Sequence, residues 1–235
     1  MLLSYRKKAS ASSVYETRVP ENAFDEEIKS WWSAETADPG EWISVDLGKT
    51  CRINAVQINF AEQDIDPAVQ AGAEDYHQYV LEYSNDNVKW EVLVDKSKNM
   101  VSVPHDYIQL AKPIKARYLK LTNLHFPGNL RFSVRDLRVF GHGLGKRPGP
   151  VRNLNITRNA TNDCSASLQW EKAQNADGYI IRYGKSKDKL YLHYQVWQDN
   201  TLTINSLDAG AKYYFTIDSY NDSGITKGKT VYELS

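Results

Sequence analysis

The chain has 235 residues, a length that predicts one or two domains at about 100–200 residues each. It carries 29 basic and 29 acidic residues, so no overall positive field exists to hold a nucleic acid or an anionic membrane. Charged residues make up 25% and apolar residues 41%, as in soluble globular proteins. Because no apolar run reaches the ~18 residues of a membrane-spanning helix, we expect no membrane insertion. The start, "MLLSYRKKASASS", also contains no apolar stretch long enough for a signal peptide.

Alternation with a period of two dominates the first half of the chain. Apolar residues alternate in "WISVDLG", "INAVQINF" and "YVLEYS"; "WEVLVD", "RYLKLTNL" and "VRDLRVFG" are strand-like too, with turn residues between the runs. Short alternating runs separated by turns predict an antiparallel β-sandwich. Residues 67–79 are interpreted as a long loop, and we expect essentially no helix.

The segment 141–150, "GHGLGKRPGP", is the best candidate for a domain boundary because glycine and proline are concentrated in it. The predicted division is a first domain at 1–141, a linker at 142–149 and a second domain at 150–235. The pattern restarts after the linker as seven shorter runs, which is the strand number of a small immunoglobulin-like sandwich.

The stretch "AFDEEIKSWWSA" at 23–34 places three acids shortly before two adjacent tryptophans. Three interpretations compete: a catalytic acid pair, a hard-cation site beside a core tryptophan, and a solvated acidic turn. If this piece is extended, neighbouring side chains point to opposite sides, so we expect one of the two tryptophans in the core and the other at the rim.

No catalytic motif stands out in the chain. It lacks G-x-S-x-G, H-E-x-x-H and a phosphate-binding glycine loop, and its histidines are spread out. Acids are plentiful, but none sits in a recognisable motif, so we expect no catalysis. Asp46 in "VDLG" is expected to anchor a turn or to pair with an arginine such as Arg117.

The second half resembles a fibronectin type III domain. The resemblance rests on "GPVRNL", on "LQW" with Trp170, on "GYIIRYG" and on "LDAGAKYYFTIDSYNDSG". It implies an immunoglobulin-like sandwich in which the hydroxyl of Tyr213 bonds back to nearby backbone.

The first half resembles a discoidin-like, or coagulation factor V/VIII type C, domain. The residues that carry this are "FDEEIKSWW", "EWISVDLG", "YVLEYSNDNVKWEVL", "ARYLKLTN" and "VRDLRVFG". The resemblance implies a galactose-binding-like jelly-roll sandwich, which a large bacterial family of carbohydrate-binding modules also uses. The order of the two domains resembles the C-terminal region of bacterial family 43-like glycosidases.

The family's common pattern D-G-x-x-x-T-x-W falls on Asp25, Ser30 and Trp32, which implies that Trp32 is a core residue and leaves Trp31 for the rim. In the family this loop often wraps a structural calcium ion, which takes six to eight oxygens. The resemblance implies Ca²⁺ ligands from the metal-site residues Ala23, Asp25, Ile28, Ser30 and Asp136. One departure is Glu26, where the family has glycine; glutamate is a poor occupant if the position needs a positive φ. The alternative is an acidic surface loop closed by a hydrogen bond.

Sugar binding needs an aromatic ring at the rim and polar partners for hydroxyl groups. No motif marks such a site, and the loop candidates are Trp31, Tyr76, His77, His105 and His125. We expect a non-catalytic, carbohydrate-binding ancillary region of an exported bacterial glycan-degrading protein, with polysaccharide as its partner. The alternative is a bracing module that docks on a glycosidase catalytic domain and binds no sugar itself.

Overall fold

The computed structural model describes residues 1–64 and 74–235, so most of the loop predicted at 67–79 lies outside the described residues. The chain forms two compact units, Met1–Leu144 (unit 1) and Gly145–Ser235 (unit 2), and the division falls within the glycine- and proline-rich segment 141–150. In the described ranges the helices are two short 3₁₀ turns, η1 (Pro20–Phe24) and η2 (Pro127–Asn129). None of the described helices is long and apolar enough to cross a membrane.

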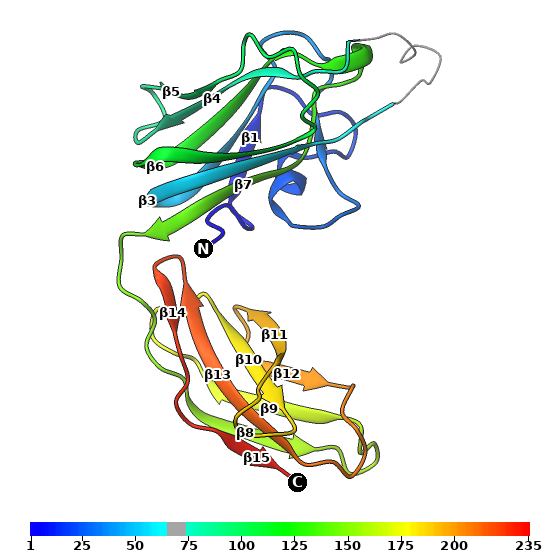
Figure 1. Cartoon of the computed structure of the whole chain (residues 1–235), viewed down its shortest axis with the longest axis vertical. Helices are drawn as coiled ribbons and strands as arrows, with labels where there is room; N and C mark the ends of the chain where they lie inside the picture. The colour runs from blue at the N-terminus through cyan, green and yellow to red at the C-terminus, as the bar shows by residue number, and fades with distance from the viewer. Residues whose placement is uncertain (65–73) are drawn as a thin grey trace. The chain divides into compact units, whose positions relative to one another are not determined.

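Unit 1 is a β-sandwich built from seven strands in its described part, with the order β2-β7-β3-β6-β4-β5 and with β1 paired to β3 (Figure 1). All pairs in it are antiparallel, as the alternating runs predict. The strands are β1 (Lys8–Ala11), β2 (Trp32–Ser33), β3 (Trp42–Phe60), β4 (Gln78–Ser84), β5 (Glu91–Asp95), β6 (His105–His125) and β7 (Ser133–Gly143).

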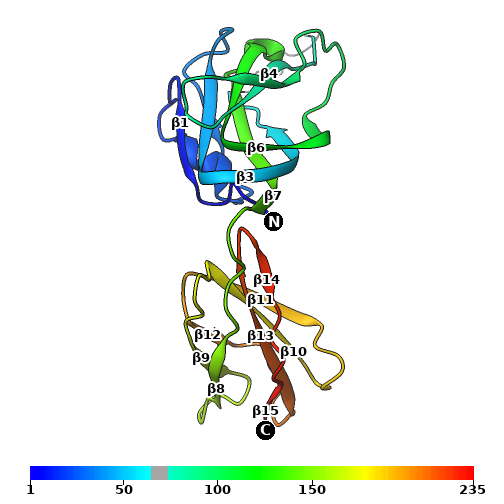
Figure 2. The same cartoon turned by 90° about the vertical axis from the view of Figure 1, so that its left-hand side faces the viewer.

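The long strands β3 and β6 each serve both layers of the sandwich. The first part of β3 pairs with β1 and with the end of β6, whereas its second part pairs with β7 and with the beginning of β6. The register shifts between Asp46 and Cys51, where Gly48 adopts φ 80°. A glycine permits this conformation without steric cost, so "DLGK" turns the strand from one layer into the other. Both views show β3 and β6 as neighbours (Figure 2).

A β-bulge explains an irregularity in the alternation of "CRINAVQINF". Cys51 and Ile53 point into the core, and Val56 and Ile58 do so after the register shifts between Ile53 and Ala55. One extra residue in a strand reverses which side chains face inward beyond it. The bulge therefore keeps apolar side chains inside along the whole second part of β3.

The core of unit 1 contains Trp32, which is fully buried and meets Phe132 edge to face at 5.3 Å. Trp31, its neighbour, is only half-buried. The prediction that the adjacent pair divides into a core residue and a rim residue is confirmed. The other large side chains that are completely buried in this core include Phe24, Tyr79, Phe132, Leu47, Leu81 and Leu119.

The two ends of unit 1 differ. At one end, which we call the loop end, both termini of β3 and both termini of β6 lie together, because each of these strands turns from one layer into the other. The backbone pairs Trp42–Thr122 and Asn59–His105 lie at this end, and β4 and β7 begin there. At the opposite end, the exit end, Gly143 pairs with Cys51, and β7 leaves toward unit 2. His142 and Gly143, expected in the linker, are thus part of β7.

The N-terminal residues 1–3 lie antiparallel to the end of β7. The Leu3 amide donates to the Val139 carbonyl at 2.7 Å, and the Gly141 amide donates to the Met1 carbonyl at 3.0 Å. The Met1 ammonium group also donates to the Gly141 carbonyl at 2.9 Å. Both chain ends of unit 1 therefore lie side by side at the exit end.

Unit 2 consists of two packed antiparallel sheets, β11-β10-β13-β14 with β15 on β13, and β12-β9-β8. It has eight strands where the sequence predicted seven, because "GIT" forms a three-residue strand that is too short to show a periodic pattern. The strands are β8 (Arg152–Arg158), β9 (Ala166–Glu171), β10 (Gly178–Gly184), β11 (Leu192–Trp197), β12 (Thr201–Ile204), β13 (Tyr213–Asn221), β14 (Gly224–Thr226) and β15 (Tyr232–Leu234).

The predicted landmarks of unit 2 lie in its core. Trp170 meets Tyr179 edge to face at 5.2 Å, and Tyr183 stacks on Phe215 at 5.4 Å. The Asp208 amide donates to the Tyr213 hydroxyl at 3.2 Å. This bond between a side chain and the backbone a few residues upstream confirms the expected tyrosine corner.

Candidate functional site

Trp31 stands at the loop end, between η1 and β2, and is held from several sides. The guanidinium of Arg18 lies 3.6 Å from its ring centroid, and that of Arg135 lies 6.0 Å away. Its indole N–H donates to Gln63 Oε1 at 2.9 Å. The ring is therefore fixed, but Arg18 covers part of it, so Trp31 is not the bare stacking surface that the sequence predicted.

A second stacked pair lies in the same network. The Arg131 guanidinium sits 3.7 Å from the ring centroid of Tyr15, and its Nε donates to Asp64 Oδ2 at 2.9 Å. Gln63 Nε2 donates to the other oxygen of Asp64 at 2.7 Å, and together with Arg131 it holds the pKa of that carboxyl below its usual range. Asp64 thus remains ionised and joins the two aromatic stacks.

A third pair of planar side chains, here two rings, lies where β4 begins and β6 ends. Tyr76 and His125 face each other with ring centroids 4.7 Å apart, and Nε2 of His125 is buried without a hydrogen-bond partner among the described residues. The loop 96–104 packs beside them, because Asn99 donates to the His77 carbonyl at 3.0 Å and Ser102 donates to Asp75 at 3.0 Å.

His77 belongs to the core, although the sequence placed it among the glycan-binding candidates. Its ring stacks on Phe60 at a centroid distance of 4.0 Å with the planes 8° apart, and it meets Phe126 edge to face at 4.9 Å. Burial lowers its pKa from 6.5 to about 4; the charge of Asp75 acts in the opposite direction, and His125 lowers the pKa further. A ring enclosed in this way is not presented to a bound sugar.

His105 is exposed at the start of β6. Its Nδ1 lies 3.1 Å from the Asn59 Oδ1 atom. The structure therefore brings Tyr76 and His125 into contact, and it places Trp31 and His105 at the same end of the unit.

The acidic loop at 23–30 is closed by its own hydrogen bonds. The Ser30 hydroxyl donates to Asp25 Oδ2 at 2.8 Å and also lies 2.9 Å from Oδ1, and the Glu27 amide donates to Asp25 Oδ1 at 2.8 Å. Two predicted calcium ligands, a carboxylate and a hydroxyl, are thus together. Ala23 is buried, and the Ile28 side chain is exposed while its carbonyl accepts from Arg135 at 3.3 Å.

Glu26 has φ 63°, so the position does need the conformation for which the family uses glycine. A non-glycine residue there costs about 1 kcal/mol or more. The Glu26 carboxylate pairs with Arg138, with Nε–Oε1 and Nη2–Oε2 distances of 2.9 Å. This ion pair at a half-exposed site offsets part of the backbone cost.

Asp136 is buried in β7, and its carboxylate is already engaged. Oδ2 accepts from Asn59 Nδ2 at 2.8 Å, and Oδ1 lies 3.7 Å from Arg138 Nη2. Among the residues described, no group of three or more His, Cys, Asp or Glu side chains could hold a metal ion. The predicted calcium site contains only two carboxylates together with a hydroxyl and carbonyl groups, so it remains a prediction.

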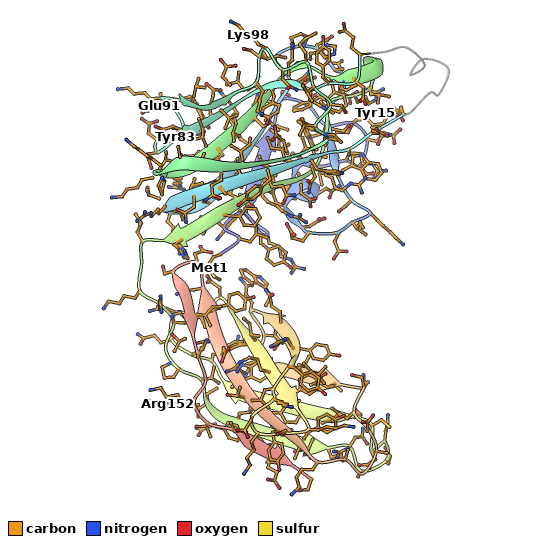
Figure 3. The ribbon with its side chains drawn as sticks, in the orientation of Figure 1. Met1, Tyr15, Tyr83, Glu91, Lys98 and Arg152 are labelled. Carbon is orange, nitrogen blue, oxygen red and sulfur yellow. The ribbon has the colours of Figure 1, made fainter. Side chains whose placement is uncertain are left out.

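Figure 3 shows Tyr15 at one end of unit 1 and Tyr83 and Glu91 at the other. The exit end carries structural ion pairs: Arg117 Nε and Nη2 donate to Asp46 at 2.7 and 2.8 Å, which confirms the expected pairing. The hydrogen bond from Arg117 lowers the pKa of Asp46. The planar polar and aromatic stacks are instead at the loop end.

Sequence reasoning missed Tyr15, Arg18, Gln63, Asp64 and Arg131. They come from three parts of the chain, and no spacing connects those parts. Position was the remaining signal: Gln63 and Asp64 follow the run "INAVQINF" and Arg131 precedes "VRDLRVFG", where loops of a sandwich meet at one end.

The model of the F5/8 type C domain family matches residues 8–135, and that of the fibronectin type III domain family matches residues 149–233. Unit 1 and unit 2 each contain one of these matched ranges.

Several solved structures are similar to the chain. Chitosan-binding module 1 of a chitosanase/glucanase from Paenibacillus sp. IK-5 is 22% identical, covers 60% of this chain and 99% of its own, and has a TM-score of 0.49. The module CpGH89CBM32-6 of Clostridium perfringens is 16% identical, with 60% and 99% covered and a TM-score of 0.48. A fucose-binding module of Streptococcus pneumoniae is 20% identical, with 60% and 96% covered and a TM-score of 0.45.

Proposed function

Since the chain belongs to the F5/8 type C domain family and continues into a fibronectin type III domain, we propose that unit 1 binds a glycan at its loop end. The chain would be a non-catalytic ancillary region of an exported bacterial glycan-degrading protein. Unit 2 would act as a spacer. Its partner would be a polysaccharide, on which a catalytic domain of the same protein acts.

One observation carries the proposal. Three pairs of planar side chains in contact lie at the loop end: Arg18 on Trp31 at 3.6 Å, Arg131 on Tyr15 at 3.7 Å, and Tyr76 tilted against His125 at 4.7 Å. Sugar sites combine aromatic faces with fixed amide, carboxylate and guanidinium groups, because sugar rings present C–H faces and hydroxyl edges. Gln63 and Asp64 supply an amide and a carboxylate within this network.

The position of these pairs also favours binding. They lie at the end of unit 1 opposite to the strand residues Gly143 and Cys51, where the chain leaves. A ligand at the loop end therefore meets no obstruction from the chain exit of unit 1. This is the arrangement expected of a module that carries a ligand site on its free end.

The test is isothermal titration of the full chain with arabinan, xylan and galactose-containing oligosaccharides. Trp31→Ala is expected to weaken binding at least tenfold, and Tyr76→Ala reports separately on the pair that Tyr76 forms with His125. The matched control is Trp90→Ala, which removes another cation-covered tryptophan, 4.4 Å from Lys120 Nζ, near the exit end. Flat titrations at millimolar concentrations of every sugar, neutral or acidic, or equal losses in Trp31→Ala and Trp90→Ala, would contradict the proposal.

The second candidate function is bracing of a catalytic domain without sugar binding. It is favoured by Met100 and Val101, which are each 64% exposed in the loop 96–104. Two adjacent exposed apolar side chains fit a protein contact. Tight association with a separately expressed glycosidase domain that is lost in Met100→Asp, together with flat sugar titrations, would favour this alternative.

A structural calcium ion is proposed for the loop 23–30. The carboxylate of Asp25 and the hydroxyl of Ser30 are hard oxygen donors that already lie within 2.9 Å of each other, and loop carbonyls from Ala23 and Ile28 would add to them. Asp136 would complete the shell only by exchanging its contact with Arg138. The ion would lock the loop and take no part in sugar recognition.

A further inference from the structure

Arg18 differs from the other stacked arginine at the loop end. Both guanidiniums lie within 3.7 Å of an aromatic centroid. Arg131, however, donates to Asp64 and to the Glu35 carbonyl. The Arg18 guanidinium has no hydrogen bond or ion pair with any of the residues that the structure describes. It is a fixed cation whose donors are still available.

Arg135 adds a second under-used guanidinium at the same indole. Its Nη1 makes one long hydrogen bond of 3.3 Å to the Ile28 carbonyl, and its Nε is buried without an acceptor in the described part of the chain. The oxygens of the nearby Asp64 carboxylate accept from Gln63 and Arg131, so Asp64 interacts with Arg18 through its charge and accepts no hydrogen bond from it. Two arginines thus keep unused donors beside Trp31.

These donors match one class of ligand. A guanidinium is planar, always charged and presents its N–H groups as a fork that fits both oxygens of a carboxylate. Stacking on an indole fixes its plane in advance, so less side-chain freedom is lost when the carboxylate binds. A neutral sugar hydroxyl would use neither the charge nor the fork.

We propose that Arg18, fixed on Trp31 and assisted by Arg135, recognises the carboxylate of an acidic sugar. The ligand would be a polysaccharide that contains uronic acid residues. This inference rests on the proposed glycan-binding function and adds the class of sugar. It assigns Trp31 the role of a support for the guanidinium as well as that of a rim aromatic.

The test compares acidic oligosaccharides with their own methyl esters, which keep the sugar ring and remove the charge. Oligogalacturonides, alginate oligomers and glucuronic acid-bearing xylo-oligosaccharides are titrated into the full chain, each beside its ester. At least one acid is expected to bind tenfold or more tightly than its ester, with a preference that shrinks as salt rises.

Arg18→Gln is expected to bring the affinity ratio of acid to ester close to one, and Arg18→Lys should leave an intermediate ratio because charge remains without the planar fork. The matched control is Arg6→Gln, which removes another guanidinium from an aromatic face, 5.2 Å from the Tyr5 centroid. This control should keep the full ratio. The backbone bond from the Ser33 amide to the Arg18 carbonyl is unaffected by these changes, and thermal unfolding verifies the fold.

Equal binding of acids and esters, or a ratio unchanged in Arg18→Gln, would overturn the acidic-sugar inference while glycan binding stands. Absence of binding to every acidic and neutral sugar would overturn both proposals. The two failures are therefore distinguishable in one set of titrations.

Discussion

Acid should destabilise unit 1 through His77. This ring is 7% exposed and stacked on Phe60, and burial lowers its pKa from 6.5 to about 4. The unfolded chain takes up a proton on this histidine below about pH 6.5, whereas the folded chain does not until about pH 4. The contribution of His77 to the free energy of unfolding is therefore fully present above pH 6.5. It falls as the pH drops toward 4 and stays constant below that.

The magnitude follows from the two pKa values. They differ by about 2.5, and each unit corresponds to about 1.4 kcal/mol, so His77 should remove about 3 kcal/mol of the free energy of unfolding between pH 7 and pH 4. This is a large part of the ~5–15 kcal/mol that stabilises an ordinary domain. Carboxyl groups also titrate in this pH range, and comparison with variants that lack His77 separates their contribution from that of His77.

The assay is urea unfolding at intervals from pH 4 to pH 8, with hydrogen exchange of β3 peptides as the readout specific to unit 1. His77→Phe and His77→Leu both remove the titrating group. Both are made so that poor packing of one replacement does not decide the result. Each should show a pH dependence flatter than that of the native chain by about 3 kcal/mol. His105→Gln, a change at an exposed histidine of the same unit, is the control. Parallel curves for the native chain and both His77 variants would refute the reasoning.

Three further predictions concern single contacts. Glu26→Gly and Glu26→Ala both lose the Arg138 ion pair, but only glycine adopts the φ of 63° without strain. Urea unfolding should therefore find the glycine variant more stable than the alanine variant by about 1 kcal/mol. Equal stability of the two variants would argue against strain. Tyr213→Phe deletes the acceptor of the Asp208 amide and should cost unit 2 about 1 kcal/mol in the same assay, whereas no change would mean that water replaces the bond. Calcium should raise the melting temperature of unit 1 relative to EGTA, and the difference should vanish in Asp25→Ala; identical melting in both solutions would exclude the site.

Much of the fold follows from period-two alternation, because burial of one face imposes it on every sandwich strand. The same rule could have located His77. Tyr79 and Leu81 face inward, and stepping back by two residues from Tyr79 reaches His77. The burial of His77 was nevertheless hard to foresee, because the apolar partners that enclose it, Phe60 and Phe126, come from distant parts of the chain.

The candidate site was less accessible to sequence reasoning. The contact of Arg18 with Trp31 joins residues in one loop region, but the partner of the indole N–H, Gln63, is 32 positions further on. Such contacts depend on which loops the strand register brings to one end, and no local pattern encodes them. The partner of Asp46 is different: Arg117 begins the run "RYLKLTNL", and this run pairs with "WISVDLG" in the sheet.

The adjacency of the two chain ends of unit 1 determines how the unit responds to mechanical tension. Residues 1–3 lie antiparallel to the end of β7, with hydrogen bonds at Met1–Gly141 and Leu3–Val139. A force that pulls residue 1 away from residue 144 loads these bonds one after another, as in a zipper, and opens the pair from the exit end inward. We therefore expect unit 1 to detach its first strand segment at low force in an optical-tweezers experiment. The loop-end side chains, at the other end of the sandwich, would stay assembled during that first step.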